Sequence, residues 1–199
     1  MSVREVAATG QKRVDPRVKR TRELIVRAFE DLVAERGHTG LTVQEIAERA
    51  TVNRATFYAH FADQYELFDH FVSESFQKEL RERLPETPEF SEETLRALIL
   101  VTCDYLERLN TACSWKDRRF RPAIEARVQR ELYKLLLGGL QASPEGSEGA
   151  RFSPEVAASA ASWAIFGAAS DWSRLGTAKV SSTEIADQVL SVIVQGLRL

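Results

Sequence analysis

The side chains best suited to chemistry in this chain are hydrogen-bond donors, and they gather between residues 53 and 56. Arg54 carries a planar guanidinium that can donate two parallel hydrogen bonds to the edge of a guanine. Asn53 and Thr56 are short polar side chains that can reach bases or phosphate oxygens. This grouping favours recognition of a nucleic-acid surface over bond-making chemistry.

Side chains that could support catalysis or bind a metal lack the necessary spacing. His38, His60 and His70 include no pair four residues apart, and the two cysteines do not have the spacing of a zinc finger. The chain also lacks a GxSxG elbow, a P-loop and a dinucleotide-binding fingerprint. We therefore expect no enzyme activity, no metal and no cofactor.

Two short helices joined by a tight break are predicted to position the donors. A capping box of Thr42 and Glu45 opens the first helix, and Asn53 caps the second, which runs over about residues 54–61. An apolar set would pack the two together: Ile46, Ala47, Val52 and Phe57. A longer helix starting at Asp15-Pro16 lies behind them. This helix-turn-helix arrangement would present the outer face of the second helix to a major groove.

The run from Leu41 to Phe61 resembles the signature of the TetR family of transcriptional regulators. Its most specific part is Thr56-Phe57-Tyr58-Ala59-His60-Phe61, where the family has Thr/Ser, an aromatic, Tyr, any residue, His/Tyr and Phe. The similarity covers about residues 18–72. Helical periodicity along the chain predicts an all-α protein of about nine helices. The resemblance implies an N-terminal three-helix DNA-binding domain and a larger C-terminal helical domain for ligand binding and dimerisation.

The resemblance also implies roles for matching residues. Thr42 would contact phosphate through its side chain or nearby amides, and Arg54 and Thr56 would lie in the groove. Tyr58 and His60 would donate hydrogen bonds to phosphates near the end of the recognition helix. Two alternatives remain open: Tyr58 could be a core tyrosine, and His60 could be an ordinary surface histidine.

Two positions depart from the family pattern. Thr51 stands where the turn commonly has glycine, and a non-glycine residue there must adopt a costlier backbone or a different turn. Gln64, preceded by Asp63, stands where a lysine commonly grips phosphate, so it can donate a hydrogen bond without charge. A basic arm could compensate, unless it is only a solvated tail: Lys12, Arg13, Arg17, Lys19, Arg20 and Arg22.

The distribution of charge fits a chain that meets an anionic polymer at one end. Residues 1–62 hold 11 Lys/Arg and 8 Asp/Glu, whereas residues 63–199 hold 16 and 21. We expect a flexible basic arm over residues 1–14, the helix-turn-helix domain over 15–62 and a connecting helix over 63–84. Residues 85–199 would form the dimerisation and ligand-binding domain.

The C-terminal part is predicted to pair with a second copy. A helix with a run of alanines from Ala157 to Ala169 has thin sides, and an apolar last helix follows it. The alternative is that both helices are intramolecular core. For any single residue of the central helices, ordinary core packing is the favoured interpretation. A ligand pocket among these helices would be lined by aromatic and apolar residues: Tyr105, Leu109, Cys113, Trp115, Phe120, Tyr133, Trp163 and Phe166.

These features together predict a sequence-specific, DNA-binding transcriptional regulator, a dimeric repressor released from its operator by a small molecule. The alternative is a helical ligand-binding or interaction protein without operator-specific regulation. Expected partners are a near-palindromic double-stranded operator, a second copy of the chain and a small apolar or aromatic ligand. No apolar run reaches the roughly 18 residues of a membrane span, and Cys103 and Cys113 lie too far apart on one helix for a disulfide, so we expect a cytoplasmic protein without a membrane partner.

Overall fold

The computed structural model describes residues 15–37, 40–84, 91–112, 121–142, 152–175 and 180–197, and these form helices and no strand. The helices are α1 (Pro16–Arg36), α2 (Val43–Arg49), α3 (Arg54–His60), α4 (Gln64–Arg83), α5 (Glu92–Ala112), α6 (Arg121–Ala142), α7 (Pro154–Arg174) and α8 (Ser182–Leu197). The all-α prediction is confirmed. The described residues hold eight helices, where about nine are expected for the whole chain.

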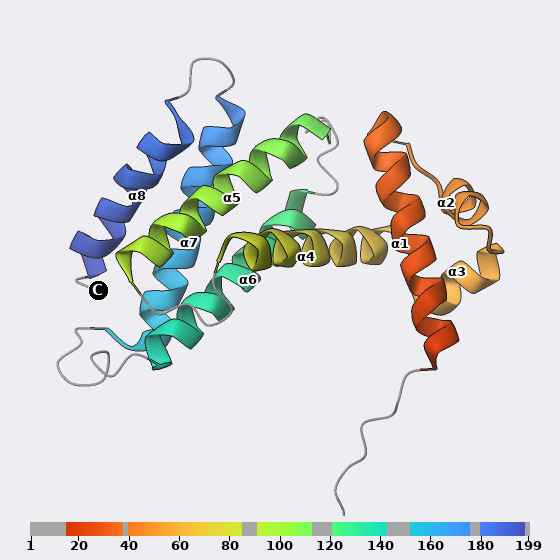
Figure 1. Ribbon diagram of the computed structural model, residues 1–199, viewed down its shortest axis with the longest axis horizontal. Helices are drawn as coiled ribbons and strands as arrows, with labels where there is room; N and C mark the ends of the chain where they lie inside the picture. The colour runs from red at the N-terminus through yellow and green to blue at the C-terminus, as the bar shows by residue number, and fades with distance from the viewer. Residues whose placement is uncertain are drawn as a thin grey trace, which may run out of the picture.

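The helices form a small head and a larger body (Figure 1). The head is α1, α2 and α3, the body is α5 to α8, and α4 runs between them. Aromatic side chains of α4 pack at both ends. Phe68 and Phe71 meet Phe29 of α1 with ring centroids 6.2 and 5.5 Å away, and Phe76 meets Tyr105 of α5 at 4.9 Å. One continuous hydrophobic core therefore joins head and body through α4.

Local capping sets where the head's helices begin. The Thr42–Glu45 capping box is present in both directions, and the Asn53 side chain accepts a hydrogen bond from the Thr56 amide at 2.7 Å. Asp63 caps α4 by accepting from the amides of Tyr65 and Glu66, both at 2.8 Å. The helix starts predicted at these three positions are confirmed.

The turn between α2 and α3 bends through a left-handed residue. Thr51 has a φ of 57°, the only positive φ outside glycine in the described residues. Its amide donates to the Glu48 carbonyl at 3.1 Å, and the Val52 amide donates to the Ala47 carbonyl at 2.9 Å. This is the Schellman pattern that usually has glycine in the left-handed place. The chain therefore keeps the ordinary turn and accepts a strained threonine.

No helix among the described residues is long and apolar enough to cross a membrane. The same residues hold no group of three or more His, Cys, Asp or Glu side chains arranged to bind a metal ion.

Candidate nucleic-acid interface

A shallow hollow on the outer surface of the head brings together four of the seven predicted contact residues. Thr42, Arg54, Tyr58 and Gln64 all line it. They come from the start of α2, the outer face of α3 and the start of α4, so the tight α2–α3 turn and the Asp63 cap are what place them side by side. Its remaining lining residues are Leu41, Val43, Gln44, Asp63 and Tyr65.

Arg54 and Tyr58 lie one helical turn apart on the exposed face of α3. Tyr58 is 47% exposed, which rules out the alternative that it is a core tyrosine. Its ring rests edge-on against Phe57, which is fully buried, at 5.5 Å between centroids. The phenol is therefore held on a rigid base and can meet a molecule that covers α3.

The side chain of Thr42 is exposed, but its hydrogen-bonding groups are already engaged within the chain. Its hydroxyl donates to the Glu45 carboxylate at 2.8 Å, and its amide donates to the same carboxylate at 2.9 Å. Hydrogen bonds from Arg36 and then from Thr42 lower the pKa of Glu45 to about 2, so the acceptor is ionised at neutral pH. Of the two contact modes predicted for Thr42, the nearby amides are the one that leaves the capping box intact.

Three predicted residues lie outside the hollow. The Asn53 side-chain oxygen is engaged by the helix cap, and Thr56 is half-buried one turn into α3. His60 is half-buried at the last position of α3, and its carbonyl accepts a hydrogen bond from Arg22 of α1 at 2.9 Å. Arg54 and Tyr58 of α3 therefore line the hollow, whereas Thr56 and His60 of the same helix and its N-cap Asn53 do not.

Several cations of the head are already paired within the chain. Arg49 donates two hydrogen bonds to Glu35 at 2.8 and 2.7 Å, and Arg36 donates to Glu45 at 2.7 Å. Of the predicted basic arm, Arg17, Lys19 and Arg20 are exposed in the first turns of α1, Arg22 is half-buried, and Lys12 and Arg13 lie outside the described residues. Counting charges along the sequence therefore overstates the positive charge available to a ligand.

Sequence reasoning missed two residues of the hollow, Gln44 and Tyr65. Both lie close in sequence to predicted contact residues: Gln44 is two places after Thr42, and Tyr65 directly follows Gln64. Hydrogen-bonding side chains in the first turn of a helix next to a recognition helix were the signal that could have found them.

Comparisons with known proteins place the head in a family. Residues 25–71 match the profile described as "Bacterial regulatory proteins, tetR family". Two regulators of Bacillus subtilis (strain 168) are similar over the same region: the HTH-type transcriptional regulator YxbF is 39% identical over 66 residues, and YdeS is 36% identical over 74. These segments cover 33% and 37% of this chain, and only 17% of YxbF and 35% of YdeS.

The whole chain also resembles a solved structure. FadR of Thermus thermophilus, a TetR-family transcriptional repressor solved in complex with lauroyl-CoA, is 25% identical with a TM-score of 0.65. The likeness covers 88% of this chain and 94% of that one, so it includes the body as well as the head. The head of this chain therefore matches the TetR family of regulators, and the fold of the whole chain is similar to that of a TetR-family repressor.

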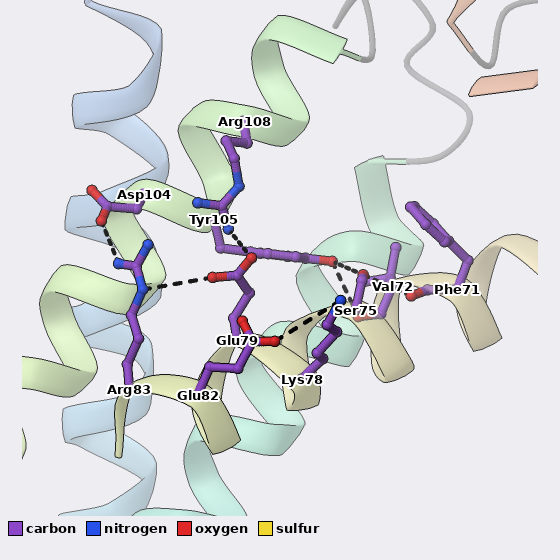
Figure 2. A network of polar contacts seen from close by, with 10 residues as sticks. All are labelled: Phe71, Val72, Ser75, Lys78, Glu79, Glu82, Arg83, Asp104, Tyr105 and Arg108. Atoms are coloured by element: carbon purple, nitrogen blue, oxygen red, sulfur yellow. Dashed lines mark hydrogen bonds and ion pairs between the residues drawn. The ribbon is translucent and has the colours of Figure 1, made fainter. Parts of the chain in front are cut away.

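Behind the head, α4 is held against the body by buried and charged contacts (Figure 2). The Tyr105 hydroxyl of α5 lies 2.8 Å from the Ser75 hydroxyl and donates to the Val72 carbonyl at 3.1 Å. Ser75 in turn donates to the Phe71 carbonyl at 2.7 Å. Tyr105 is buried, so these polar groups satisfy one another inside the α4–α5 contact.

A second set of contacts lies toward the end of α4. Glu79 pairs with Arg108 of α5 and lies 3.7 Å from Arg83, which itself pairs with Asp104 of α5 (Figure 2). On the other side, Asp69 of α4 pairs with a half-buried arginine of α6, Arg127, whose Nε is 3.1 Å from Oδ1. Two helices of the body, α5 and α6, therefore form ion pairs with α4.

The residues predicted to line a ligand pocket differ widely in solvent exposure. Tyr105, Leu109 and Phe166 are buried and Tyr133 is half-buried, whereas Trp163 is 49% exposed on α7. In the single chain Trp163 therefore faces solvent rather than the interior, although its ring meets that of Phe166 at 6.3 Å. The other three, Cys113, Trp115 and Phe120, lie outside the described residues.

Proposed function

We propose that this TetR-family protein is a dimeric repressor that binds an operator through its head and releases it when a small molecule binds the body. One observation carries the proposal: Thr42, Arg54, Tyr58 and Gln64, which come from three helices, line one exposed hollow of the head. A donor set of this kind, beside the face of a recognition helix, suits phosphate oxygens and base edges. The similar fold of FadR of Thermus thermophilus, a TetR-family repressor, supports the same conclusion.

Within the head, residues 15–62, we assign two kinds of contact. Arg54, with Asn53 and Thr56, would face base edges at the start of α3. Tyr58, His60, Gln64 and the amides next to Thr42 would position the head on phosphates. Gln64 lacks the charge of a lysine, so Arg17, Lys19 and Arg20 in the first turns of α1 would supply part of the charge neutralisation.

The direct test is binding of the full-length protein to duplex DNA. A pool of random sequences is selected for binding, and the recovered site is compared with scrambled DNA at several salt concentrations. A repressor should recover a near-palindromic site and lose affinity steeply as salt rises. A helical ligand carrier would recover no site, and that result would reject the proposal.

For the dimer we propose the face formed by α7 and α8. Large apolar side chains are exposed there in the single chain, Trp163 at 49% and Val192 at 68%. On the same helix as Trp163, Ala160 is exposed and Ala164 half-buried, whereas other alanines of the predicted run pack inside the chain: Ala157, Ala158, Ala161 and Ala169. A two-fold dimer would present two heads to two half-sites about one helical turn of DNA apart. Exposed apolar area of this kind is what a second copy would cover.

For the ligand we propose a small apolar or aromatic molecule held among the body helices next to α4 and α5. Tyr105 touches α4 directly, so a ligand that shifts its ring would shift α4 and with it the head. Lauroyl-CoA, which is bound in the structure of FadR of Thermus thermophilus, is a suitable first probe of an apolar ligand. Resorcinol, which is bound in the structure of RolR, a protein of similar fold, is a suitable first probe of an aromatic ligand. Release of the selected site by one probe at micromolar concentration supports the proposal, and release by neither rejects these two ligands.

Since the proposed target is operator DNA, we also propose that the protein acts in the cytoplasm.

A further inference from the structure

The recognition helix α3 is too short to hold its own geometry. It has seven residues, and an isolated helix of that length is marginal in water. Its first turn is secured by the Asn53 cap and its middle by the buried ring of Phe57. The end that carries Tyr58 and His60 needs a separate support, because the last carbonyls of a helix have no partner within it.

Arg22 of α1 supplies that support from 38 residues away in the sequence. Its Nη1 donates to the carbonyl of His60, the last residue of α3, at 2.9 Å. Its guanidinium carbon lies 4.2 Å from the centre of the Phe61 ring, which is buried. A cation at this end also opposes the negative pole of the helix dipole and gains from the ring's negative face.

The same contacts separate Arg22 from the exposed cations of its helix. Arg17, Lys19 and Arg20 project into solvent, whereas Arg22 is half-buried, with Nη1 bonded to the His60 carbonyl and its flat face against Phe61. Both contacts lie at the C-terminal end of α3, so we expect the contribution of Arg22 to DNA binding to pass through that helix.

We propose that Arg22 is a positioning residue for DNA binding: it fixes the C-terminal end of α3, and so Tyr58 and His60, without touching DNA itself. The inference rests on the proposed function, since it assigns a role within that same DNA-binding head. It also replaces the sequence-based expectation that Arg22 belongs to a phosphate-binding arm.

The test compares Arg22→Gln, Arg22→Lys and Arg27→Gln in the full-length protein. Arg27 is an exposed cation of α1 outside the hollow, so Arg27→Gln is a matched loss of one charge. Affinity for the selected site is measured across a salt series. Arg22→Gln should lose about tenfold in affinity, as expected for one hydrogen bond to a charged group, with an unchanged salt slope. Arg22→Lys, which keeps a cationic donor, should recover part of the loss, and Arg27→Gln should stay within about twofold, because weak surface charges contribute little.

A double-mutant cycle with His60→Ala separates positioning from general destabilisation. If Arg22 acts through the end of α3, removing His60 should have a smaller effect in the Arg22→Gln background than in the wild type. Amide exchange should also be faster in α3 while α5 to α7 remain protected.

Three results would overturn the inference. One is an unchanged affinity for Arg22→Gln, and another is full additivity with His60→Ala. The third is a salt slope that falls by about 0.9 for each lost contact, which would make Arg22 a phosphate ligand. If the wild type itself binds no DNA, the proposed function fails, and unchanged α3 exchange in Arg22→Gln would then reject the structural part independently.

Discussion

Tyr58 and His60 stand two residues apart near the end of α3, yet they differ in exposure. Tyr58 projects into the hollow of the head, whereas His60 is half-buried with its carbonyl engaged. We predict that Tyr58→Phe and His60→Ala weaken binding to specific and random DNA to the same extent, because phosphate contacts carry no base information. Each lost bond to a charged oxygen should cost about 1.5–3 kcal/mol. A gel-shift series in which neither variant loses affinity would refute both roles.

Arg54 is predicted to govern the choice of sequence. It is the first residue of α3 and lies exposed at the hollow, where a bidentate contact to guanine discriminates by about 1–3 kcal/mol. Arg54→Ala should therefore lose its preference at one base position in each half-site while keeping most non-specific binding. Selection from a random pool, wild type against variant, measures this. An identical consensus at lower overall affinity would mean that Arg54 contacts only phosphate.

Thr51 is predicted to be a site where stability can be gained. A left-handed L-residue costs about 1–2 kcal/mol, and glycine avoids this at an entropic cost of up to about 1 kcal/mol. Thr51→Gly should raise the free energy of unfolding by roughly 0.5–1 kcal/mol in urea titrations. Thr51→Ala serves as the control, because it removes the branched side chain but keeps a Cβ in the strained position. Equal stability of Thr51→Gly and the wild type would count against strain at this turn.

His70 is predicted to make folding stability depend on pH. Burial, followed by the nearby charge of Arg22, holds the pKa of His70 below its ordinary value of about 6.5. The unfolded chain then binds the proton more readily than the folded one, so stability should be lost as pH falls from about 6.5 toward the lowered pKa. His70→Gln should remove this part of the slope in urea titrations between pH 7 and 5. A slope that persists unchanged in the variant would assign the dependence to other groups.

The contacts of a single side chain can be predicted from the sequence when its partners lie a few residues away in the chain. The caps at Thr42, Asn53 and Asp63 follow from side chains two or three places away, and they are confirmed. Arg22 could not be placed in this way, because its partners at His60 and Phe61 are brought to it only by tertiary folding. The pairing of Arg36 and Arg49 with glutamates was missed for the same reason.

Among the helices, α4 is predicted to depend on Tyr105 for its place on the body. Tyr105→Phe removes a buried hydroxyl that reaches Val72 and Ser75, and the groups left behind should cost about 1–3 kcal/mol in unfolding. Ser75→Ala removes the other hydroxyl, and the two losses should be less than additive because they share one bond. Urea titrations of both single variants and the double variant measure this; fully independent losses would show that the bond contributes nothing.

Helix positions were predictable because period-3.6 apolar patterns and turn residues are local features. Helices α1 to α4 and the alanine-rich α7 fall where the sequence predicts them. Which helices contact one another was harder to predict, since every amphipathic helix of the body offers a similar apolar stripe. The charged contacts of Glu79, Arg83 and Arg108 join α4 to α5. The length of the segment between the two helices does not predict how α5 is oriented against α4.

The whole molecule is predicted to be a dimer in solution through α7 and α8. Val192→Arg places a charge on an apolar side chain that is 68% exposed in the single chain, so it should disrupt the pair without disturbing the core. Thr183→Arg, at an exposed position near the start of the same helix, is the control. Sedimentation at micromolar concentration should give a dimer for wild type and control and more monomer for Val192→Arg. A wild-type species near the chain mass of 22.4 kDa would reject the dimer.

The placement of α4 between head and body has a mechanical consequence (Figure 1). Its 20 residues make a rod about 30 Å long, and a rod turns a small rotation at one end into a larger displacement at the other. If α4 pivots at its Arg83 end, where Arg83 pairs with Asp104 of α5, a tilt of about 5° would move the opposite end by about 2.6 Å over that length. Two such tips in a dimer would change their separation by up to about 5 Å, a mismatch comparable to more than one base-pair step along DNA of about 3.4 Å. A ligand therefore needs to shift its own contacts by less than the width of an atom to put both heads out of register.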